Sequence, residues 1–127
     1  MKIAAILTFI LIASRSFSQQ PHIIPIGSDL NFYTSDTLSI NDAKKISKLT
    51  YIYCDGQKPK QERVVQFEVY NGATNQFAFC IGEFLTDSAK MIITPNSTPY
   101  ILYLQKMVST NGQDSTQLTY KKIVVIN

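Results

Sequence analysis

The C-terminal segment from Pro99 to Asn127 constrains most strongly how this chain can fold. Two runs rich in β-branched, aromatic and aliphatic residues, Tyr100–Val108 and Gln117–Ile126, flank a polar loop that contains Asn111-Gly112. An Asn-Gly pair favours the positive φ angles of a tight reversal, so the segment predicts a β-hairpin. Both strands carry apolar residues on each face. Such strands belong inside a sheet or between two layers, because an isolated hairpin is only marginally stable in water.

The first eighteen residues differ sharply in composition from the rest of the chain. Lys2 precedes an uncharged, almost wholly apolar run over Ile3–Ala13, and small residues, Ser16 and Ser18, occupy the −3 and −1 positions of a cleavage point. This pattern predicts a secretory signal peptide over residues 1–18, because the apolar run is shorter than the ~20 residues that a membrane-spanning helix needs. We therefore expect a periplasmic or secreted protein without a stable membrane span after cleavage, with residues 19–127 as a single domain.

Loss of residues 1–18 would also remove most of the positive charge of the chain. The whole sequence has 12 basic and 9 acidic side chains, and Lys2 and Arg15 lie in the segment that is lost. The remaining chain is close to neutral and has no basic stripe. Binding to nucleic acid or to an anionic membrane surface is therefore not expected.

Short strands with turn signals between them fill the middle of the chain. Residues 19–29 hold two prolines among isoleucines and predict an extended lead-in that docks on the domain. Ser39–Leu49 predicts a helix of two or three turns, capped by Ser39 or Asn41. A second, shorter helical turn is expected after Thr86. The expected strands are Leu30–Tyr33, Thr50–Cys54, Glu62–Tyr70 and Phe77–Ile81.

Two of these strands show a clear alternation of side chains. In Glu62–Tyr70, Val65, Phe67 and Val69 point one way, while Gln66, Glu68 and Tyr70 point the other way. In the next strand, Phe77, Phe79 and Ile81 share one face. Because turn signals recur at short intervals, we predict a mainly β fold, an immunoglobulin-like β-sandwich with two short helical segments.

No catalytic or metal-binding constellation is present in the sequence. His22 is the only histidine, and it lies in a proline-flanked segment without Cys, Asp or Glu beside it. A base in such a segment is not held rigidly enough for nucleophilic catalysis. Glu62 and Glu68 have the even spacing of ordinary outward strand residues, and no phosphate-binding loop, zinc spacing or calcium loop occurs. We expect no enzymatic activity, no cofactor and no bound metal.

Cys54 and Cys80 each lie at the end of an expected strand. In an exported protein such an isolated pair is a candidate disulfide, which would stabilise the fold by about 3–4 kcal/mol in the chain-entropy view. The alternative is a pair of buried thiols that pack as small apolar groups. Sequence spacing does not decide between the two.

Three tripeptides combine an aspartate, a hydroxyl residue and a small or aliphatic residue: Asp36-Thr37-Leu38, Asp87-Ser88-Ala89 and Asp114-Ser115-Thr116. They are similar to the periplasmic O-glycosylation motif of Bacteroidetes. That similarity makes Thr37, Ser88 and Ser115 candidate O-glycosylation sites. Asp-Ser and Asp-Thr are also ordinary turn and capping pairs, so both interpretations stand.

Several stretches occur in the order and spacing of a known family. They are Ser39-Ile40-Asn41-Asp42-Ala43 leading into Leu49, Val64–Val69, Gly82–Asp87 leading into Ile92, Tyr100–Leu104, the loop Asn111–Asp114, and Leu118–Ile126. Residues 39–127 thereby resemble the C-terminal domain of the gliding-motility and type IX secretion protein GldM of Bacteroidetes. The resemblance implies a β-rich periplasmic domain that contacts a protein partner in the cell envelope and has no catalytic residues. GldM also has a membrane-anchored helix and further domains, so the expectation is a free-standing relative.

Two other classes of function also fit the composition. A small-ligand or glycan carrier would line a cleft with five tyrosines: Tyr51, Tyr53, Tyr70, Tyr100 and Tyr103. An inhibitor of a secreted hydrolase is the third class. An apolar concave pocket favours the carrier, whereas a flat exposed patch or a free edge strand favours the interaction module.

An interaction module of this kind would bind through the unpaired backbone of an edge strand. The expected edges are Phe77–Ile81 and Leu30–Tyr33, whereas the C-terminal strand is expected to be internal. At such an edge, Ala78→Pro is expected to remove a ladder donor at little cost to the fold and to abolish binding.

Overall fold

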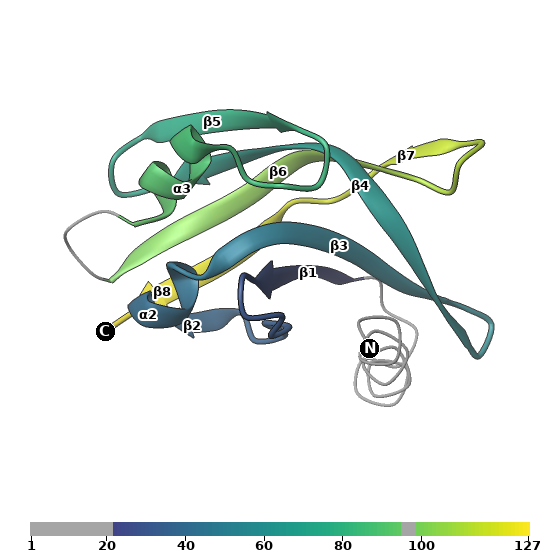
Figure 1. Cartoon of the computed structure of the whole chain (residues 1–127), viewed down its shortest axis with the longest axis horizontal. Helices are drawn as coiled ribbons and strands as arrows, with labels where there is room; N and C mark the ends of the chain where they lie inside the picture. Colours follow the sequence, from purple (N-terminus) through teal and green to yellow (C-terminus); the bar gives the residue numbers. More distant parts are fainter. Residues whose placement is uncertain (1–21, 95–98) are drawn as a thin grey trace.

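The computed structural model describes residues 22–94 and 99–127, and Figure 1 shows their arrangement. The predicted signal peptide, residues 1–18, lies outside the described residues. The strands are β1 (His22–Gly27), β2 (Thr37–Ser39), β3 (Ile46–Asp55), β4 (Lys58–Asn71), β5 (Gln76–Ile81), β6 (Tyr100–Thr110), β7 (Ser115–Gln117) and β8 (Lys121–Ile126). The helices in the described residues are α2 (Ile40–Ala43) and α3 (Asp87–Ile93). The predicted class, a mainly β, sandwich-like fold with two short helices, is confirmed.

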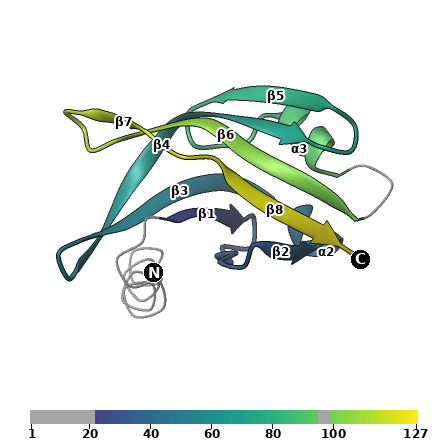
Figure 2. The same ribbon diagram turned by 180° about the vertical axis from the view of Figure 1, so that it is seen from behind.

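One curled, eight-stranded sheet makes up this fold. Its order is β1-β3-β4-β6-β8-β2, with β5 paired to β4 and β7 paired to β6. All pairs are antiparallel except β2 with β8. Seen from behind, β8 lies between β6 and β2 (Figure 2). The C-terminal strand is therefore internal, as its apolar faces predicted.

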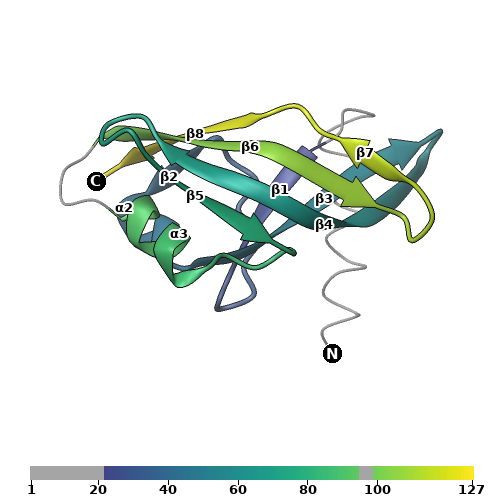
Figure 3. The ribbon, with the colours of Figure 1, turned by 90° about the horizontal axis from the view of Figure 1, so that it is seen from above.

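The curled sheet forms two layers, and the long strand β4 runs from one into the other. Its first half, Lys58–Arg63, pairs with β3, whereas its second half, Gln66–Asn71, pairs with β5. β6 follows the opposite edge of β4, with register shifts near Gln66. In Figure 1 the layer of β4, β5 and β6, which we call the upper layer, lies above the layer of β1 and β3, which we call the lower layer. In Figure 3 the strands β8, β6, β4 and β5 follow one another from the top of the picture downward. The core lies between these layers.

Side chains of β4 point into this core much as the alternation predicted. Phe67 and Val69 are fully buried. At the start of the strand Val64 is buried while Val65 is only half-buried, because the ladder to β6 shifts register between Val64 and Gln66. A bulge of this kind moves the following residues relative to the core.

The C-terminal hairpin is confirmed, with a different turn geometry. β6 pairs with β8 from Tyr100↔Val125 to Leu104↔Lys121. Of the Asn111-Gly112 pair, only Gly112 has a positive φ, 98°. The Asn111 side chain instead closes the loop, because its Oδ1 accepts hydrogen bonds from the backbone N–H groups of the two residues that follow Gly112, at 2.9 and 2.8 Å.

The expected helix over Ser39–Leu49 is wrong beyond its first turn. Ser39 is the N-cap, and its Oγ accepts from the Asp42 backbone N–H at 3.1 Å. Helix α2 ends at Ala43, and the chain runs as β3 from Ile46. Ile46 and Leu49 are buried in the core, where pairing of β3 with β1 outweighs the weak local helix propensity.

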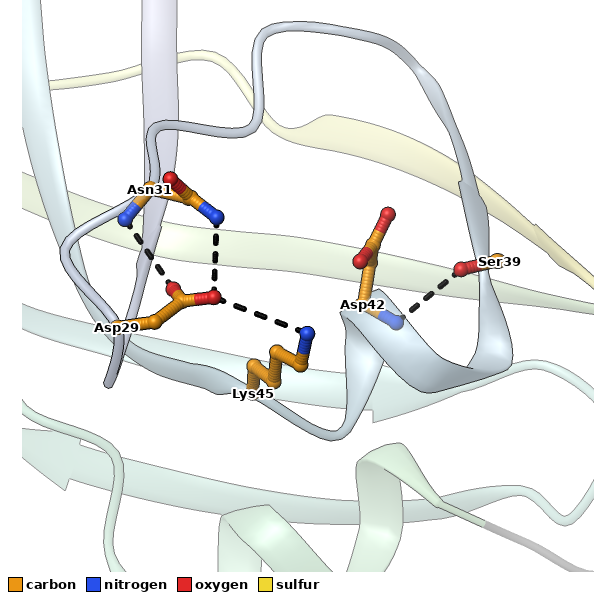
Figure 4. A network of polar contacts seen from close by, with 5 residues as sticks. All are labelled: Asp29, Asn31, Ser39, Asp42 and Lys45. Atoms are coloured by element: carbon orange, nitrogen blue, oxygen red, sulfur yellow. Dashed lines mark hydrogen bonds and ion pairs between the residues drawn. The ribbon is translucent and has the colours of Figure 1, made fainter.

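A polar network supports the connection before α2, as Figure 4 shows. The Asp29 carboxylate accepts from the backbone N–H of Asn31 at 3.1 Å and from its Nδ2 at 3.0 Å. Lys45 Nζ lies 3.7 Å from the same carboxylate. These contacts hold the loop after β1 against the residues that lead into β3.

Residues 19–29 were expected to form an extended lead-in that docks on the domain. Instead, His22–Gly27 of this segment is β1, a strand of the sheet that pairs with β3. Pro25 is tolerated there. Its carbonyl accepts from the Tyr33 N–H at 2.9 Å, so its backbone faces away from β3 and the missing N–H breaks no bond of that ladder. The expected strand Leu30–Tyr33 is wrong, since it is reduced to a single bridge between Phe32 and Ile26.

The second predicted helical turn, after Thr86, is confirmed as α3. Thr86 Oγ1 accepts from the Ala89 backbone N–H at 3.2 Å and caps the helix. Ala89 and Ile93 are buried against the core. The buried Asn71 at the end of β4 donates from Nδ2 to the Ile92 carbonyl at 2.9 Å, which ties α3 to the upper layer.

Tyr100 links the same helix to β6 and makes the fold sensitive to high pH. Its side chain is buried, and its hydroxyl donates to the Ile93 carbonyl. Burial raises the pKa of Tyr100 from 10.0 to about 12. Because the folded state favours the neutral phenol, this stabilisation is complete below pH 10 and is lost as the pH rises through 12.

We expect the free energy of unfolding to fall between about pH 10 and pH 12, and to fall less steeply in Tyr100→Phe, which has no phenol to ionise. Burial also raises the pKa values of Tyr33 and Tyr51, so some dependence on pH will persist in the variant. Urea titrations at both ends of this range measure the difference. An equal fall in the two proteins would contradict the role of Tyr100.

Candidate functional site

Strand β5 forms a free edge of the upper layer. It pairs with β4, and no other segment of residues 22–94 and 99–127 pairs with its second edge. The Gly82 N–H donates to the Val65 carbonyl of β4 at 2.7 Å, so the backbone groups of Gly82 face β4. Along an antiparallel strand, the backbone groups of successive residues face the partner strand and the opposite edge in turn. Every second residue before Gly82 therefore faces β4. The backbone groups that face the free edge belong to Phe77, Phe79 and Ile81, which we call the edge trio.

The edge trio also carries the exposed apolar side chains of β5. Phe77, Phe79 and Ile81 are 64%, 44% and 78% exposed, whereas Cys80 between them is fully buried. β5 contains no charged residue and no proline, although exposed edges usually carry such features to prevent pairing. The predicted sharing of one face is confirmed, and this face points to solvent.

The solvent face of the trio continues across β4, β6 and β8, and we call it the outer face. Phe77 lies opposite Tyr70, Tyr70 opposite Tyr103, and Tyr103 opposite Lys122. The ring centroids of Tyr70 and Tyr103 are 6.0 Å apart, and those of Tyr103 and Tyr120 are 6.1 Å apart. An aromatic row thus crosses these strands, which Figure 3 shows side by side.

A carboxylate lies within this outer face. Glu68 faces Phe79 on one side and Gln105 on the other. The sequence predicted an ordinary outward residue, but its neighbours bury it. Its Oε1 accepts from Gln105 Nε2 at 2.7 Å, and Lys106 Nζ lies 3.4 Å from its Oε2. The negative charge beneath the trio is therefore paired within the chain.

A cleft of about 630 Å³ lies elsewhere, between the start of β1 and the segment that leads into β8. His22, Tyr51 and Tyr120 contribute to its lining, and Lys121 Nζ donates to Asp36 Oδ1 at 2.9 Å beside it. Burial and the Lys121 ammonium lower the pKa of His22, while Asp36 opposes that shift. Among the described residues, no three His, Cys, Asp or Glu side chains gather to hold a metal ion.

The five tyrosines expected to line one cleft are dispersed over the molecule. Tyr100 lies in the core. Tyr51 and Tyr53 stack on β3 with ring centroids 5.4 Å apart, while Tyr70 and Tyr103 lie on the outer face. Of the five, only Tyr51 contributes to the cleft lining. The expectation of a tyrosine-lined cleft is wrong, because successive residues of a strand point to opposite faces, so Tyr100 and Tyr103, three residues apart on β6, lie on opposite sides of the sheet.

The candidate disulfide between Cys54 and Cys80 is not formed. Cys54 pairs with Pro59 of β4, and Cys80 pairs with Phe67 of the same strand. Eight residues of strand span about 26 Å, whereas bridged cysteines have Cα atoms within about 7 Å. Cys80 is a buried thiol whose Sγ lies 3.8 Å from Thr86 Oγ1. The alternative, a pair of buried thiols, therefore holds in part: the two cysteines are not bridged, Cys80 is buried and Cys54 is half-buried.

The three candidate O-glycosylation sites are all exposed. Thr37 lies on β2, Ser88 near the start of α3 and Ser115 on β7. Exposure is what an attached glycan requires. Glycosylation itself stays a prediction.

Comparison with known protein families, curated proteins and solved structures finds no match. The resemblance of residues 39–127 to the GldM domain therefore stays a prediction. No helix in the described part of the chain has both the length and the apolar character needed to cross a membrane. The fold and the surface together define a mainly β, sandwich-like domain with an open apolar strand edge.

Proposed function

We propose that this protein is an exported, non-enzymatic interaction module that binds an extended segment of a partner protein on the free edge of β5. The observation that carries the proposal is the edge trio, which combines outward-facing backbone groups with exposed apolar side chains on one strand. An added strand satisfies the N–H and C=O groups of that edge. Its own apolar side chains would lie beside the trio and leave water, at roughly 25 cal/mol per Å² of apolar area.

The surroundings of the trio support an added strand over a compact ligand. The trio lies along an edge and outside the cleft, whose lining includes none of its residues. The predicted signal peptide and the resemblance to the GldM domain both support a partner in the cell envelope, met in the periplasm or after secretion. A role beside the type IX secretion or gliding machinery is the part of this proposal that rests on that resemblance alone.

The cleft favours a second candidate function, a small-ligand or glycan carrier. Its volume of about 630 Å³ falls within the range of small-molecule sites. The two candidates depend on different residues. A charged substitution in the edge trio should abolish strand docking and leave a ligand in the cleft bound.

Site-specific photo-crosslinking in the producing cells tests the proposal. We expect a photoreactive amino acid at Ile81 to form a discrete adduct with a protein, because this side chain is the most exposed of the trio. The same group at Gln57, exposed in the turn between β3 and β4, serves as the control. Phe79→Lys should abolish the adduct at Ile81, because it places a charge in the middle of the apolar edge. Equal adducts at Ile81 and Gln57, or an adduct that survives Phe79→Lys, would refute the docking mode.

A further inference from the structure

We infer that the strand added to β5 is β5 of a second copy of this chain, so that the protein forms a two-fold symmetric dimer. This inference rests on the proposed function, because it uses the same free edge. It names the occupant of that edge. The grounds are the self-complementary register of the edge trio, the absence of charge on the strand and the continuity of the outer face.

The spacing of the trio permits antiparallel pairing of β5 with itself. A two-fold axis at Phe79 places Phe79 opposite Phe79 of the second copy, and Phe77 opposite Ile81 of the second copy. All three residues have their backbone groups on the free edge. Each facing pair can therefore exchange two hydrogen bonds, as the narrow pairs of an antiparallel ladder do. The same patch serves both copies, so the assembly closes at two.

The side chains and charges also suit this register. The trio lies on one face, so its apolar side chains meet directly across the new ladder, where aromatic and β-branched pairs stabilise sheets. No charged residue of β5 meets its own copy, because the strand has none. Beyond its end, Glu83 would lie opposite the neutral Asn75. Glu68 beneath Phe79 is already paired with Lys106.

The dimer also extends a surface that each copy already has. The upper layers would join through β5 into one continuous sheet. The aromatic row of Tyr103, Tyr70 and Phe77 would then continue onto Ile81 of the second copy. A single strand pair is smaller than a standard protein interface, so we expect reversible association in the micromolar range.

Sedimentation velocity of the exported chain, residues 19–127, from about 1 to 500 µM, tests the inference. We expect a monomer at the low end, a dimer at the high end, and a monomer throughout for Phe79→Lys. Leu30→Lys is the matched control, because Leu30 is comparably exposed but lies in the loop after β1. It should dimerise like the unchanged protein. If Phe79→Lys loses cooperative unfolding, Ile81→Lys repeats the test at the most exposed member of the trio.

Amide hydrogen exchange gives a second readout that general aggregation would not reproduce. Exchange at Phe77, Phe79 and Ile81 should slow as the concentration rises, whereas exchange at Ala78 and Cys80, which face β4, should stay constant. Two results would overturn the inference of a dimer formed through β5: a monomer over the whole concentration range, or a dimer that Phe79→Lys leaves intact. If Ile81 then still crosslinks to another protein, only this inference fails. If the photoreactive group at Ile81 also forms no protein adduct, the proposed function fails together with this inference.

Discussion

Phe67→Ala is expected to lower the free energy of unfolding by about 3–5 kcal/mol. Phe67 is fully buried on β4 and lies in the core between the two layers. Its truncation removes a large apolar side chain from close-packed surroundings and leaves a cavity that rigid strands fill poorly. Urea denaturation, followed by circular dichroism, measures the change.

Phe77→Ala is the matched control, because it removes the same side chain from the neighbouring strand. Phe77 is exposed on the outer face, so its loss should cost less than about 1 kcal/mol. Both variants should be compared at about 1 µM, the low end of the sedimentation series, where we expect the monomer. Equal costs in the two variants would contradict the assignment of the two faces.

Ala78→Pro is expected to destabilise the protein by about 2–3 kcal/mol, although β5 is an edge strand. Ala78 lies opposite Val69, and its backbone groups face β4. Proline there removes a donor of the existing ladder and leaves an acceptor of β4 unpaired. The expectation from the sequence, that this variant would cost the fold little, is therefore wrong in its choice of residue.

Phe79→Pro moves the same change onto the free edge. Its N–H faces away from β4, so the monomer loses no ladder bond, whereas strand addition loses a central donor. Phe79→Ala separates the loss of the ring from the loss of the donor. Urea titrations of the three variants give the ranking. A larger cost for Phe79→Pro than for Ala78→Pro would mean that the strand alternates in the opposite sense.

Local signals were sufficient for several elements of this fold. The C-terminal hairpin, the inward alternation of Phe67 and Val69 on β4 and the caps at Ser39 and Thr86 depend on turn chemistry, on the two-residue period of a strand and on capping hydrogen bonds. Each of these acts between residues close together in the chain. The structure accordingly confirms them.

Other elements depended on partners far away in the sequence. Ile46–Leu49 has a spacing that suits a helix, yet it forms a strand because β1 pairs with it from about twenty residues earlier. The candidate disulfide between Cys54 and Cys80 depended on the register of β3 and β5 along β4. Spacing between two cysteines in the chain carries no information on that register.

The edge trio has one property that follows from the sequence and another that depends on the tertiary structure. The amino-acid sequence determined that Phe77, Phe79 and Ile81 share one face, because strand residues alternate with a period of two. Only the tertiary structure decided that this face is the exposed one, since α3 and the lower layer cover the opposite face around Cys80. A period-two pattern is unchanged when its faces are exchanged, so the face that meets water is decided only when another layer packs against one of them.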